Sequence, residues 1–144
     1  RIPAGNMCSL LAKYLEAKFV LMHIAYPYSD ELVAIAKHYS NVWVDMCWAW
    51  SIDPYSSRDF LRRFIHAVPI NKIFTYGGDT GWATSSVAYA FQARREIQKA
   101  LEAEIDDDYM NEKQAMAVAT QIMHDNQYAC FDLHNTRTNI RSAA

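Results

Sequence analysis

The chain has 144 residues, of which 51% are hydrophobic and 21% are charged, and its formal net charge is −2. This length and composition suit one domain with its own core. Because charges of both signs are interspersed and form no basic stripe, we expect no nucleic-acid partner. No apolar stretch approaches the roughly 20 residues that a membrane span requires, so we expect no membrane partner.

The start of the chain and its cysteines indicate the compartment. Arg1 begins a polar segment that contains a proline and lacks the features of a signal peptide. There is no initiator methionine, so we expect the natural N-terminus to lie upstream. Cys8, Cys47 and Cys130 are scattered and odd in number, which argues against a disulfide framework and for a reducing compartment. We therefore expect a cytoplasmic protein.

Three short apolar runs predict β-strands at residues 17–23, 41–48 and 71–77. The first is a continuous apolar run of strand length, and the second is rich in β-branched and aromatic residues. Between these runs, apolar residues recur at helical spacing and predict helices at residues 29–39 and 56–68.

Polar residues mark the ends of these two helices. Ser29 can cap the first helix, and acidic residues follow it in the first turn. Ser56, followed by Asp59, resembles a cap of the second helix, which Pro69 would end.

The alternation of strands and helices predicts parallel βαβ units, hence the α/β class. The strands are apolar on both faces, as expected for a sheet that helices cover on both sides. The strand ends recur at roughly the 30 residues of one unit in an eightfold barrel. A doubly wound sheet would have a similar spacing, so the pattern leaves the two architectures open.

Beyond residue 83 the pattern is helical only. A long amphipathic helix is predicted at residues 84–105, with Thr84 as a possible cap. A second helix begins near Asn111, whose spacing from Gln114 suggests a capping box, and a short helical stretch ends the segment. We expect residues 84–133 to be closing helices and residues 134–144, which lack periodicity, to be a mobile tail.

The candidate site lies where the predicted strands end, because parallel α/β folds bind ligands there. The first strand ends in His23, and the third is followed by Gly77, Gly78 and Asp79. A histidine and an aspartate at this edge suit metal ligation or proton transfer. Structural roles stay open for both: Asp79 could belong to a simple turn or cap, and His23 could be a core histidine bonded to a backbone carbonyl.

Other residues near the strand ends have more ordinary alternatives. The aromatic side chains of Tyr26, Trp48, Trp50 and Trp82 are candidates to line a substrate pocket, or else to pack on the helices. Asp45 interrupts an apolar strand, and we expect it to bond neighbouring groups inside the sheet. Cys47 is near the site but has no histidine beside it in sequence, so we expect no nucleophilic role.

Three stretches taken in order, KFVLMHIAYP, ELVAIAKHYSNVWVDMCW and NKIFTYGGDT, resemble the amidohydrolase superfamily. More narrowly they resemble its amidohydrolase-related metal-dependent hydrolases, of the amidohydrolase 2 type. In that family the sixth strand of a TIM barrel ends in histidine before a loop with proline, and the eighth ends in Gly-x-Asp. The stretch MHDNQYACFDL resembles the family's last helix, so the resemblance covers roughly residues 10–133. It implies that residues 1–144 are the C-terminal part of a (β/α)8 barrel.

The resemblance also implies roles and a reaction. Asp79 would contact a divalent metal ion, zinc by expectation, and take the proton from the attacking water. His23 would polarise the substrate or assist proton transfer, whereas other branches use the equivalent residue as a metal ligand. Tyr26, Trp48 and Trp82 would line the substrate pocket. The implied reaction is hydrolysis of a C–N or C–O bond in a small polar or carboxylated substrate by a metal-activated water.

Two alternatives to hydrolysis stay open. Related barrels carry out metal-assisted decarboxylation or sugar-acid isomerisation, and a self-contained three-stranded sheet could be a non-catalytic α/β binding domain. The family's His-x-His pair on the first strand is absent, as is its fourth- or fifth-strand ligand. On this interpretation strands one to five lie upstream. Three strands cannot close a barrel, so we expect the isolated chain to bind metal poorly, to be inactive and to be able to form a homo-oligomer through its exposed edges.

Overall fold

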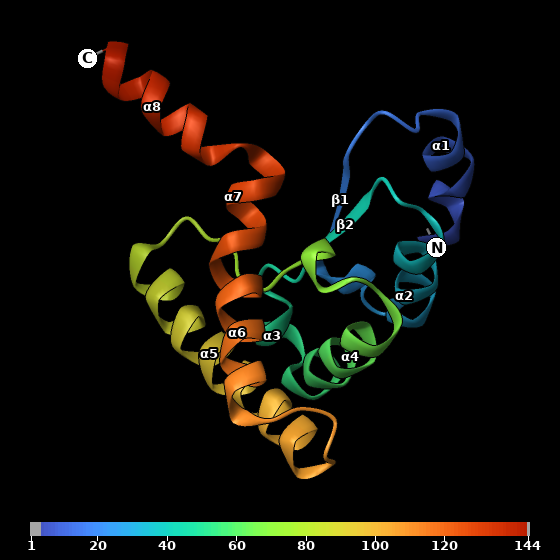
Figure 1. The fold of residues 1–144 in the computed structure, drawn as a ribbon, viewed down its shortest axis with the longest axis vertical. Coiled ribbons are helices and arrows are strands. Elements are labelled where there is room, and N and C mark those ends of the chain that lie inside the picture. Colours follow the sequence, from blue (N-terminus) through green and yellow to red (C-terminus); the bar gives the residue numbers. More distant parts are fainter. Residues whose placement is uncertain (1–3, 144) are drawn as a thin grey trace.

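The computed structural model describes residues 4–143 and contains one three-stranded parallel sheet (Figure 1). The expectation for the segment that begins at Arg1 falls outside these residues. The strands are β1 (Phe19–Met22), β2 (Val42–Asp45) and β3 (Ile73–Phe74), in the spatial order β1-β2-β3. The α-helices are α1 (Cys8–Lys13), α2 (Ser29–His38), α3 (Ala49–Ile52), α4 (Pro54–Ala67), α5 (Ala83–Asp106), α6 (Glu112–Thr120), α7 (Asn126–Phe131) and α8 (Leu133–Ala143).

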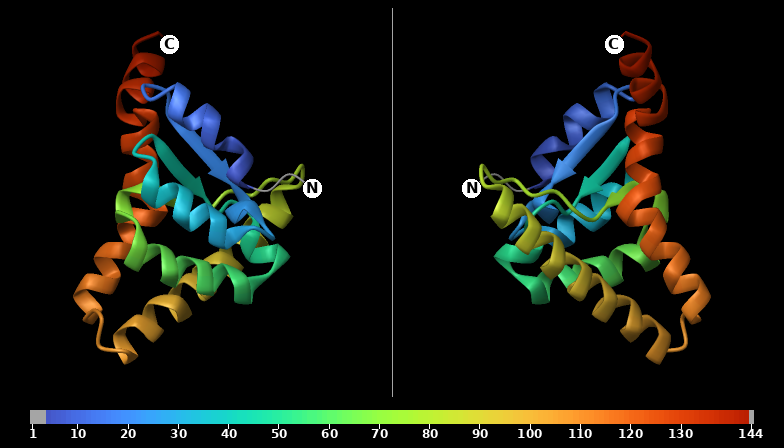
Figure 2. Two further views of the ribbon diagram at one scale, coloured as in Figure 1. Left: turned by 90° about the vertical axis from the view of Figure 1, so that its right-hand side faces the viewer. Right: turned by 90° about the vertical axis from the view of Figure 1, so that its left-hand side faces the viewer.

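The register of the sheet brings the ends of its strands to one edge. Met22 at the end of β1 lies opposite Asp45 at the end of β2, and Asp45 lies opposite Phe74 at the end of β3. Figure 2 shows the arrows of β1 and β2 pointing the same way. The predicted parallel βαβ units are therefore confirmed, and they match part of a TIM barrel. The strands are shorter than the apolar runs that predicted them: left-handed turns at His23 and Cys47 follow β1 and β2, and a 3-10 turn at Ile70–Lys72 precedes β3.

The two faces of the sheet differ in burial. Val42 and Val44 of β2 are fully buried in the core, together with Leu32 of α2 and apolar residues of α4 such as Phe60. The alternating residue Trp43 is only partly buried, and Met22 of β1 is 47% exposed. The sequence predicted helices on both faces of the sheet, because both faces are apolar. Within residues 4–143, helices bury one face, and the face with Trp43 and Met22 is only partly covered.

The start of α4 differs from the sequence-based expectation. The side chain of Asp53 accepts hydrogen bonds from the backbone N–H groups of Tyr55 and Ser56 at 3.0 and 3.1 Å. Pro54 occupies the first helical turn, where its missing N–H costs nothing. Asp53 is thus the cap, and the prediction for Ser56 was wrong. Ser29 likewise begins α2 without capping it, since Tyr28 holds the cap position and makes no side-chain cap bond.

Two closing helices agree with the sequence. Helix α5 covers the predicted residues 84–105, although Thr84 does not cap it. The predicted capping box at the start of α6 is confirmed, because the side chains of Asn111 and Gln114 each accept a backbone N–H of the other residue. None of the helices within residues 4–143 is both long and apolar enough to cross a bilayer.

The end of the chain is helical rather than irregular. Helix α8 occupies Leu133–Ala143, where the sequence predicted no regular structure, and Figure 1 shows it extending away from the rest of the fold. None of its residues is buried, and its sequence is mostly polar, with Leu133 and Ile140 as its large apolar residues. The mobility expected for residues 134–144 stays a prediction.

Two buried carboxylates on α5 fasten it to α4. Glu104 is fully buried and pairs with Arg62 and with His66, whose Nε2 lies 2.6 Å from Glu104 Oε2. Glu96 is 2% exposed, and its Oε2 lies 3.3 Å from Arg58 Nε. Such pairs compensate for the loss of hydration of the buried charges. They hold α5 against α4, at the end of the sheet where the strands terminate and the candidate site lies.

Candidate functional site

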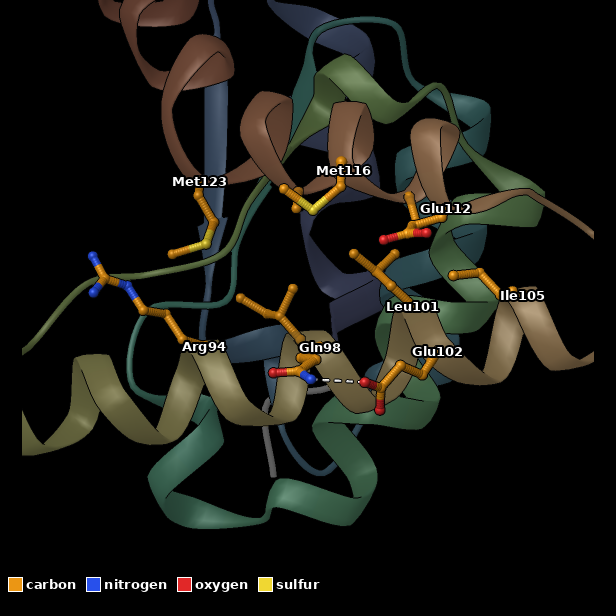
Figure 3. A pocket seen from close by; sticks show the side chains of 11 residues that line it. Arg94, Gln98, Leu101, Glu102, Ile105, Glu112, Met116 and Met123 are labelled. Atoms are coloured by element: carbon orange, nitrogen blue, oxygen red, sulfur yellow. Dashed lines mark hydrogen bonds between the residues drawn. The ribbon is translucent and has the colours of Figure 1, made fainter.

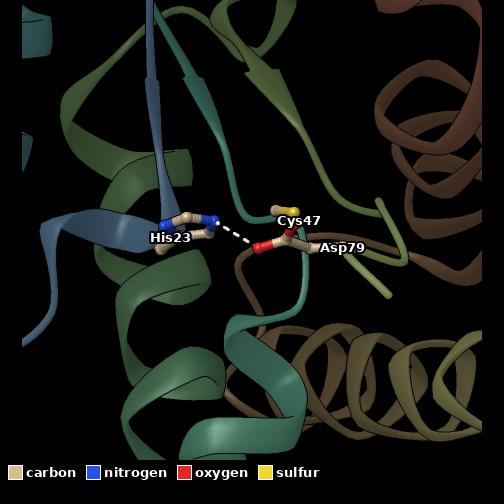
Figure 4. A group of neighbouring side chains, drawn as sticks. All are labelled: His23, Cys47 and Asp79. Atoms are coloured by element: carbon tan, nitrogen blue, oxygen red, sulfur yellow. Dashed lines mark ion pairs between the residues drawn. The ribbon is translucent and has the colours of Figure 1, made fainter. Parts of the chain in front are cut away.

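Three side chains from different strand ends meet at one edge of the sheet. His23 follows β1 directly, Cys47 follows β2, and Asp79 lies in the loop after β3. One ligand atom from each lies within 4.8 Å of the other two (Figure 4). The structure therefore brings together the two predicted site residues, His23 and Asp79, and adds Cys47 to them.

The backbone is unusual at all three positions. The φ angles are 59° at His23, 48° at Cys47 and 39° at Asp79, in the left-handed region that few residues other than glycine adopt. Each such residue costs on the order of 1–3 kcal/mol and persists only when its surroundings hold it. The turns at His23 and Cys47 follow the ends of β1 and β2, and together with the turn at Asp79 they leave the three side chains close to one another.

The histidine and the aspartate form an open pair. His23 Nε2 lies 3.4 Å from Asp79 Oδ2, and the side chains are 37% and 52% exposed. The Nε2 atom itself is shielded from solvent and has no hydrogen-bond partner within the described residues. Burying a polar atom without a partner is unfavourable, so this nitrogen is suited to an external ligand or cation.

Cys47 is fixed by its neighbour Asp45. The Cys47 N–H donates to Asp45 Oδ1 at 2.7 Å, which is the structural role expected for Asp45. Burial raises the pKa of the Asp45 carboxyl. Burial, followed by the charges of Asp45 and Asp79, also raises the pKa of the Cys47 thiol to about 11. Without a cation the sulfur therefore keeps its proton at neutral pH and is a poor nucleophile.

Of the predicted aromatic residues, Trp48 is the one beside the cluster. Its ring packs edge-to-face on His23 with 5.7 Å between centroids, and its Nε1 is buried without an acceptor within residues 4–143. Tyr26 and Trp82 are 46% and 74% exposed, so neither ring is enclosed. Trp50 is a core residue, because it is 1% exposed and donates to the carbonyl of Thr75 at 2.7 Å.

A separate groove lies between α5 and α6 and has a volume of about 490 Å³. Figure 3 shows the side chain of Leu101 on α5 facing α6, which contributes Met116, while the Gln98 amide donates to Glu102 along α5. The groove includes none of the three cluster residues, so it is not part of the candidate site.

The donor atoms of the cluster are of kinds that bind divalent metal ions. Zinc accepts imidazole nitrogen, thiolate sulfur and carboxylate oxygen, and in four-coordinate sites nitrogen and oxygen ligands lie roughly 3.3 Å apart. The separation of 3.4 Å between His23 Nε2 and Asp79 Oδ2 agrees with this, and Nε2 makes no hydrogen bond within the described residues. The residues present therefore fit a divalent cation, although they make up at most three of its ligands.

Comparisons with known proteins agree with the fold and with the polar residues at the ends of its strands. The model of the amidohydrolase family matches residues 7–132, which is most of the chain, and the chain belongs to that family. Protein fluG of Emericella nidulans is 32% identical over 142 residues, covering 90% of this chain and 15% of that protein. The family resemblance that the motifs indicated is thus confirmed.

A solved structure shares the fold. It is that of a Lactobacillus casei protein assigned as a metal-dependent hydrolase, with a TM-score of 0.71 and 18% sequence identity. The match covers 90% of this chain and 34% of that protein. The chain therefore spans about a third of this structure and a much smaller part of protein fluG.

Local sequence signals explain why Cys47 was missed as a site residue. His23 and Asp79 are polar residues that end apolar runs, whereas Cys47 lies inside an apolar run together with Met46 and Trp48. The signal that could have found it is Asp45, a carboxylate within a strand that accepts the N–H two residues later. That pattern marks a turn, and hence the end of β2 two residues before Cys47.

Proposed function

We propose that this chain is part of a metal-dependent hydrolase that uses Asp79 and His23 in catalysis. Membership of the amidohydrolase family supports this proposal, as does the assignment of the Lactobacillus casei protein as a metal-dependent hydrolase. The observation that carries it is the convergence of His23 Nε2 and Asp79 Oδ2 from the ends of β1 and β3, which are separated by β2. Polar groups of this kind at the carboxyl edge of parallel strands are characteristic of catalytic sites.

In the proposed reaction Asp79 would hold a divalent cation, by expectation zinc. When bound, such a cation would lower the pKa of an adjacent water far below its ordinary value, towards about 7. The Asp79 carboxylate accepts the proton of the attacking water. His23 Nε2 lies close enough to Asp79 Oδ2 to polarise the substrate carbonyl or to carry the proton to the leaving group.

The proposed substrate is small and polar or carboxylated, and the bond cleaved is C–N or C–O. The buried indole N–H of Trp48 supports this, because it is a hydrogen-bond donor beside His23 without an acceptor in the described residues. An oxygen atom of the substrate would satisfy it. Tyr26 and Trp82, which are exposed in the surrounding loops, would cover a bound substrate from the outside.

We also propose that β1, β2 and β3 are the sixth, seventh and eighth strands of a TIM barrel. The match to about a third of a longer protein supports this. The cation's other ligands would then come from the remaining strands. On its own, the 144-residue chain should bind zinc weakly, have no activity and tend to self-associate through the free edges of β1 and β3.

The test compares Asp79→Asn with Asp108→Asn in the intact protein. Both aspartates have positive φ angles, which asparagine tolerates, but Asp108 lies in the turn after α5, away from the site. We expect Asp79→Asn to abolish hydrolysis with unchanged circular dichroism, and Asp108→Asn to retain wild-type turnover. A fully active Asp79→Asn protein would refute the role of Asp79. Release of carbon dioxide without any hydrolysis product would favour the decarboxylase alternative.

A further inference from the structure

We infer that Cys47 is a ligand of the cation in this site, so that the metal is held by sulfur as well as by the Asp79 carboxylate. This inference rests on the proposed metal-dependent function and deepens it, because it names the class of cation that the site selects. Its basis is the placement of the Cys47 sulfur among His23 Nε2 and Asp79, all within 4.8 Å of one another (Figure 4).

The position of the sulfur is closely controlled. The backbone of Cys47 is held on one side by the bond from its N–H to Asp45 Oδ1 and on the other by the bond from Gly77 N–H to its carbonyl, at 3.3 Å. The side chain is packed against Gly77 and is only 3% exposed. A ligand held in this way loses little further freedom when it binds a cation.

An ordinary core cysteine would not require this arrangement. Cys130 is buried to a similar extent, at 8% exposure, but lies on α7 with regular helical neighbours. Cys47 instead occupies a left-handed position, and its sulfur lies within 4.8 Å of a ring nitrogen of His23 and a carboxylate oxygen of Asp79. Residues in strained backbone conformations persist where the surrounding structure holds them, and they cluster at active sites and ligand-binding sites.

A thiolate changes the choice of metal. Soft thiolate ligands select zinc and similar ions, whereas magnesium, calcium and manganese prefer carboxylate, carbonyl and water ligands. Coordination would deprotonate the Cys47 thiol and release that proton to solvent, as thiols do when they bind zinc. The site should therefore retain zinc or cobalt and exclude magnesium and manganese.

Cobalt(II) tests this inference, because a thiolate bound to cobalt gives an intense near-ultraviolet charge-transfer band, separate from the weak visible bands of cobalt itself. The intact protein is freed of metal and titrated with cobalt(II), beside the variants Cys47→Ser and Cys130→Ser. We expect the charge-transfer band in the wild type and in Cys130→Ser, and its loss in Cys47→Ser while visible cobalt bands persist. Far-ultraviolet circular dichroism checks that Cys47→Ser remains folded.

The other outcomes separate the two proposals. Visible cobalt bands without a charge-transfer band in the wild type would overturn the role of Cys47 and leave the metal-dependent function intact. A charge-transfer band that Cys130→Ser removes and Cys47→Ser retains would also overturn it. Absence of any cobalt spectrum in the intact wild-type protein would overturn both. Should Cys47→Ser unfold, Cys47→Ala takes its place and is judged by the same cobalt bands.

Discussion

Gly77 packs directly against Cys47, and a β-carbon built on Gly77 would lie 3.1 Å from the Cys47 sulfur. This is tighter than nearly all real contacts of a β-carbon, so the sulfur or the backbone would have to move by a few tenths of an ångström. The absence of a side chain at Gly77 therefore leaves the space that the Cys47 sulfur occupies.

The first prediction follows from this contact. Gly77→Ala should lower the free energy of unfolding by about 1–2 kcal/mol, as overpacking does in well-packed sites. In a Cys47→Ala background the same change should lower the free energy of unfolding much less, because the sulfur that would clash with the new β-carbon is absent. Urea unfolding of the two single variants and the double variant measures this coupling. Strictly additive effects would show that the two residues do not press on each other.

The second prediction concerns the buried carboxylate of Glu104. Arg62→Met removes one of its two partners and leaves a charge in the core with His66 alone, so we expect a loss of about 3 kcal/mol of unfolding free energy. Arg63→Met is the matched control one residue along α4. Arg63 pairs with the exposed residues Asp30 and Asp59, and such surface pairs contribute about 1 kcal/mol or less. Equal losses for the two variants would contradict the importance assigned to Glu104.

The third prediction is a pH dependence at the start of α4. Hydrogen bonds from the Ser56 hydroxyl, the Ser56 N–H and the Tyr55 N–H lower the pKa of Asp53. The folded state thus has the lower pKa, so the stabilisation is complete above the unfolded value of about 3.9 and is lost as the pH falls through the folded value.

Two variants isolate this effect by urea unfolding at pH 7 and at about pH 3. Asp53→Ala should lower the free energy of unfolding by about 1 kcal/mol at pH 7 and by less at the acidic pH. Asp53→Asn retains a capping oxygen but has no titrating group. On acidification the wild type should therefore lose more unfolding free energy than Asp53→Asn does. A wild-type advantage that is the same at both pH values would contradict the role of the ionised Asp53.

The fourth prediction concerns the anchor of α7. Asn126 is 3% exposed, and its side-chain amide donates to the carbonyls of Ile70 and Ile73, each at 2.8 Å. Asn126→Ala leaves both carbonyls without this donor, so we expect a loss of about 2–3 kcal/mol. Asn135→Ala on the exposed helix α8 should change the stability by less than about 0.5 kcal/mol. Thermal unfolding distinguishes the two, and a near-neutral Asn126→Ala would refute the anchor.

The sequence predicted the elements well where periodicity and burial coincide. The parallel strands and helices α2, α4 and α5 follow apolar patterns that face a core, and the capping box of α6 is a local signal. Helix α8 has no buried face, and α3 is a single turn of four residues, so the sequence pattern predicted neither helix. The start of α4 was misplaced because Asp53–Pro54 outcompetes the weaker signal at Ser56.

The site was predictable only in part. His23 and Asp79 could be found because polar residues at strand ends converge in a parallel sheet, and the structure puts their side chains 3.4 Å apart. Cys47 depends on a left-handed turn fixed by Asp45 and on the small size of Gly77. These are relationships through space between separate loops, and no run of neighbouring residues carries them.

The parallel pairing of β1, β2 and β3 also determines when the site can exist. Parallel strands cannot be joined by a tight turn, so each pairing requires a complete helical crossover. His23, Cys47 and Asp79 meet only after both crossovers have closed, and such non-local contacts form slowly because chain entropy must be lost first. An opening that lifts α2 or α4 from the sheet would separate the three side chains while most helices persist. The rate at which the proposed cation is released would then measure this local opening, well before global unfolding.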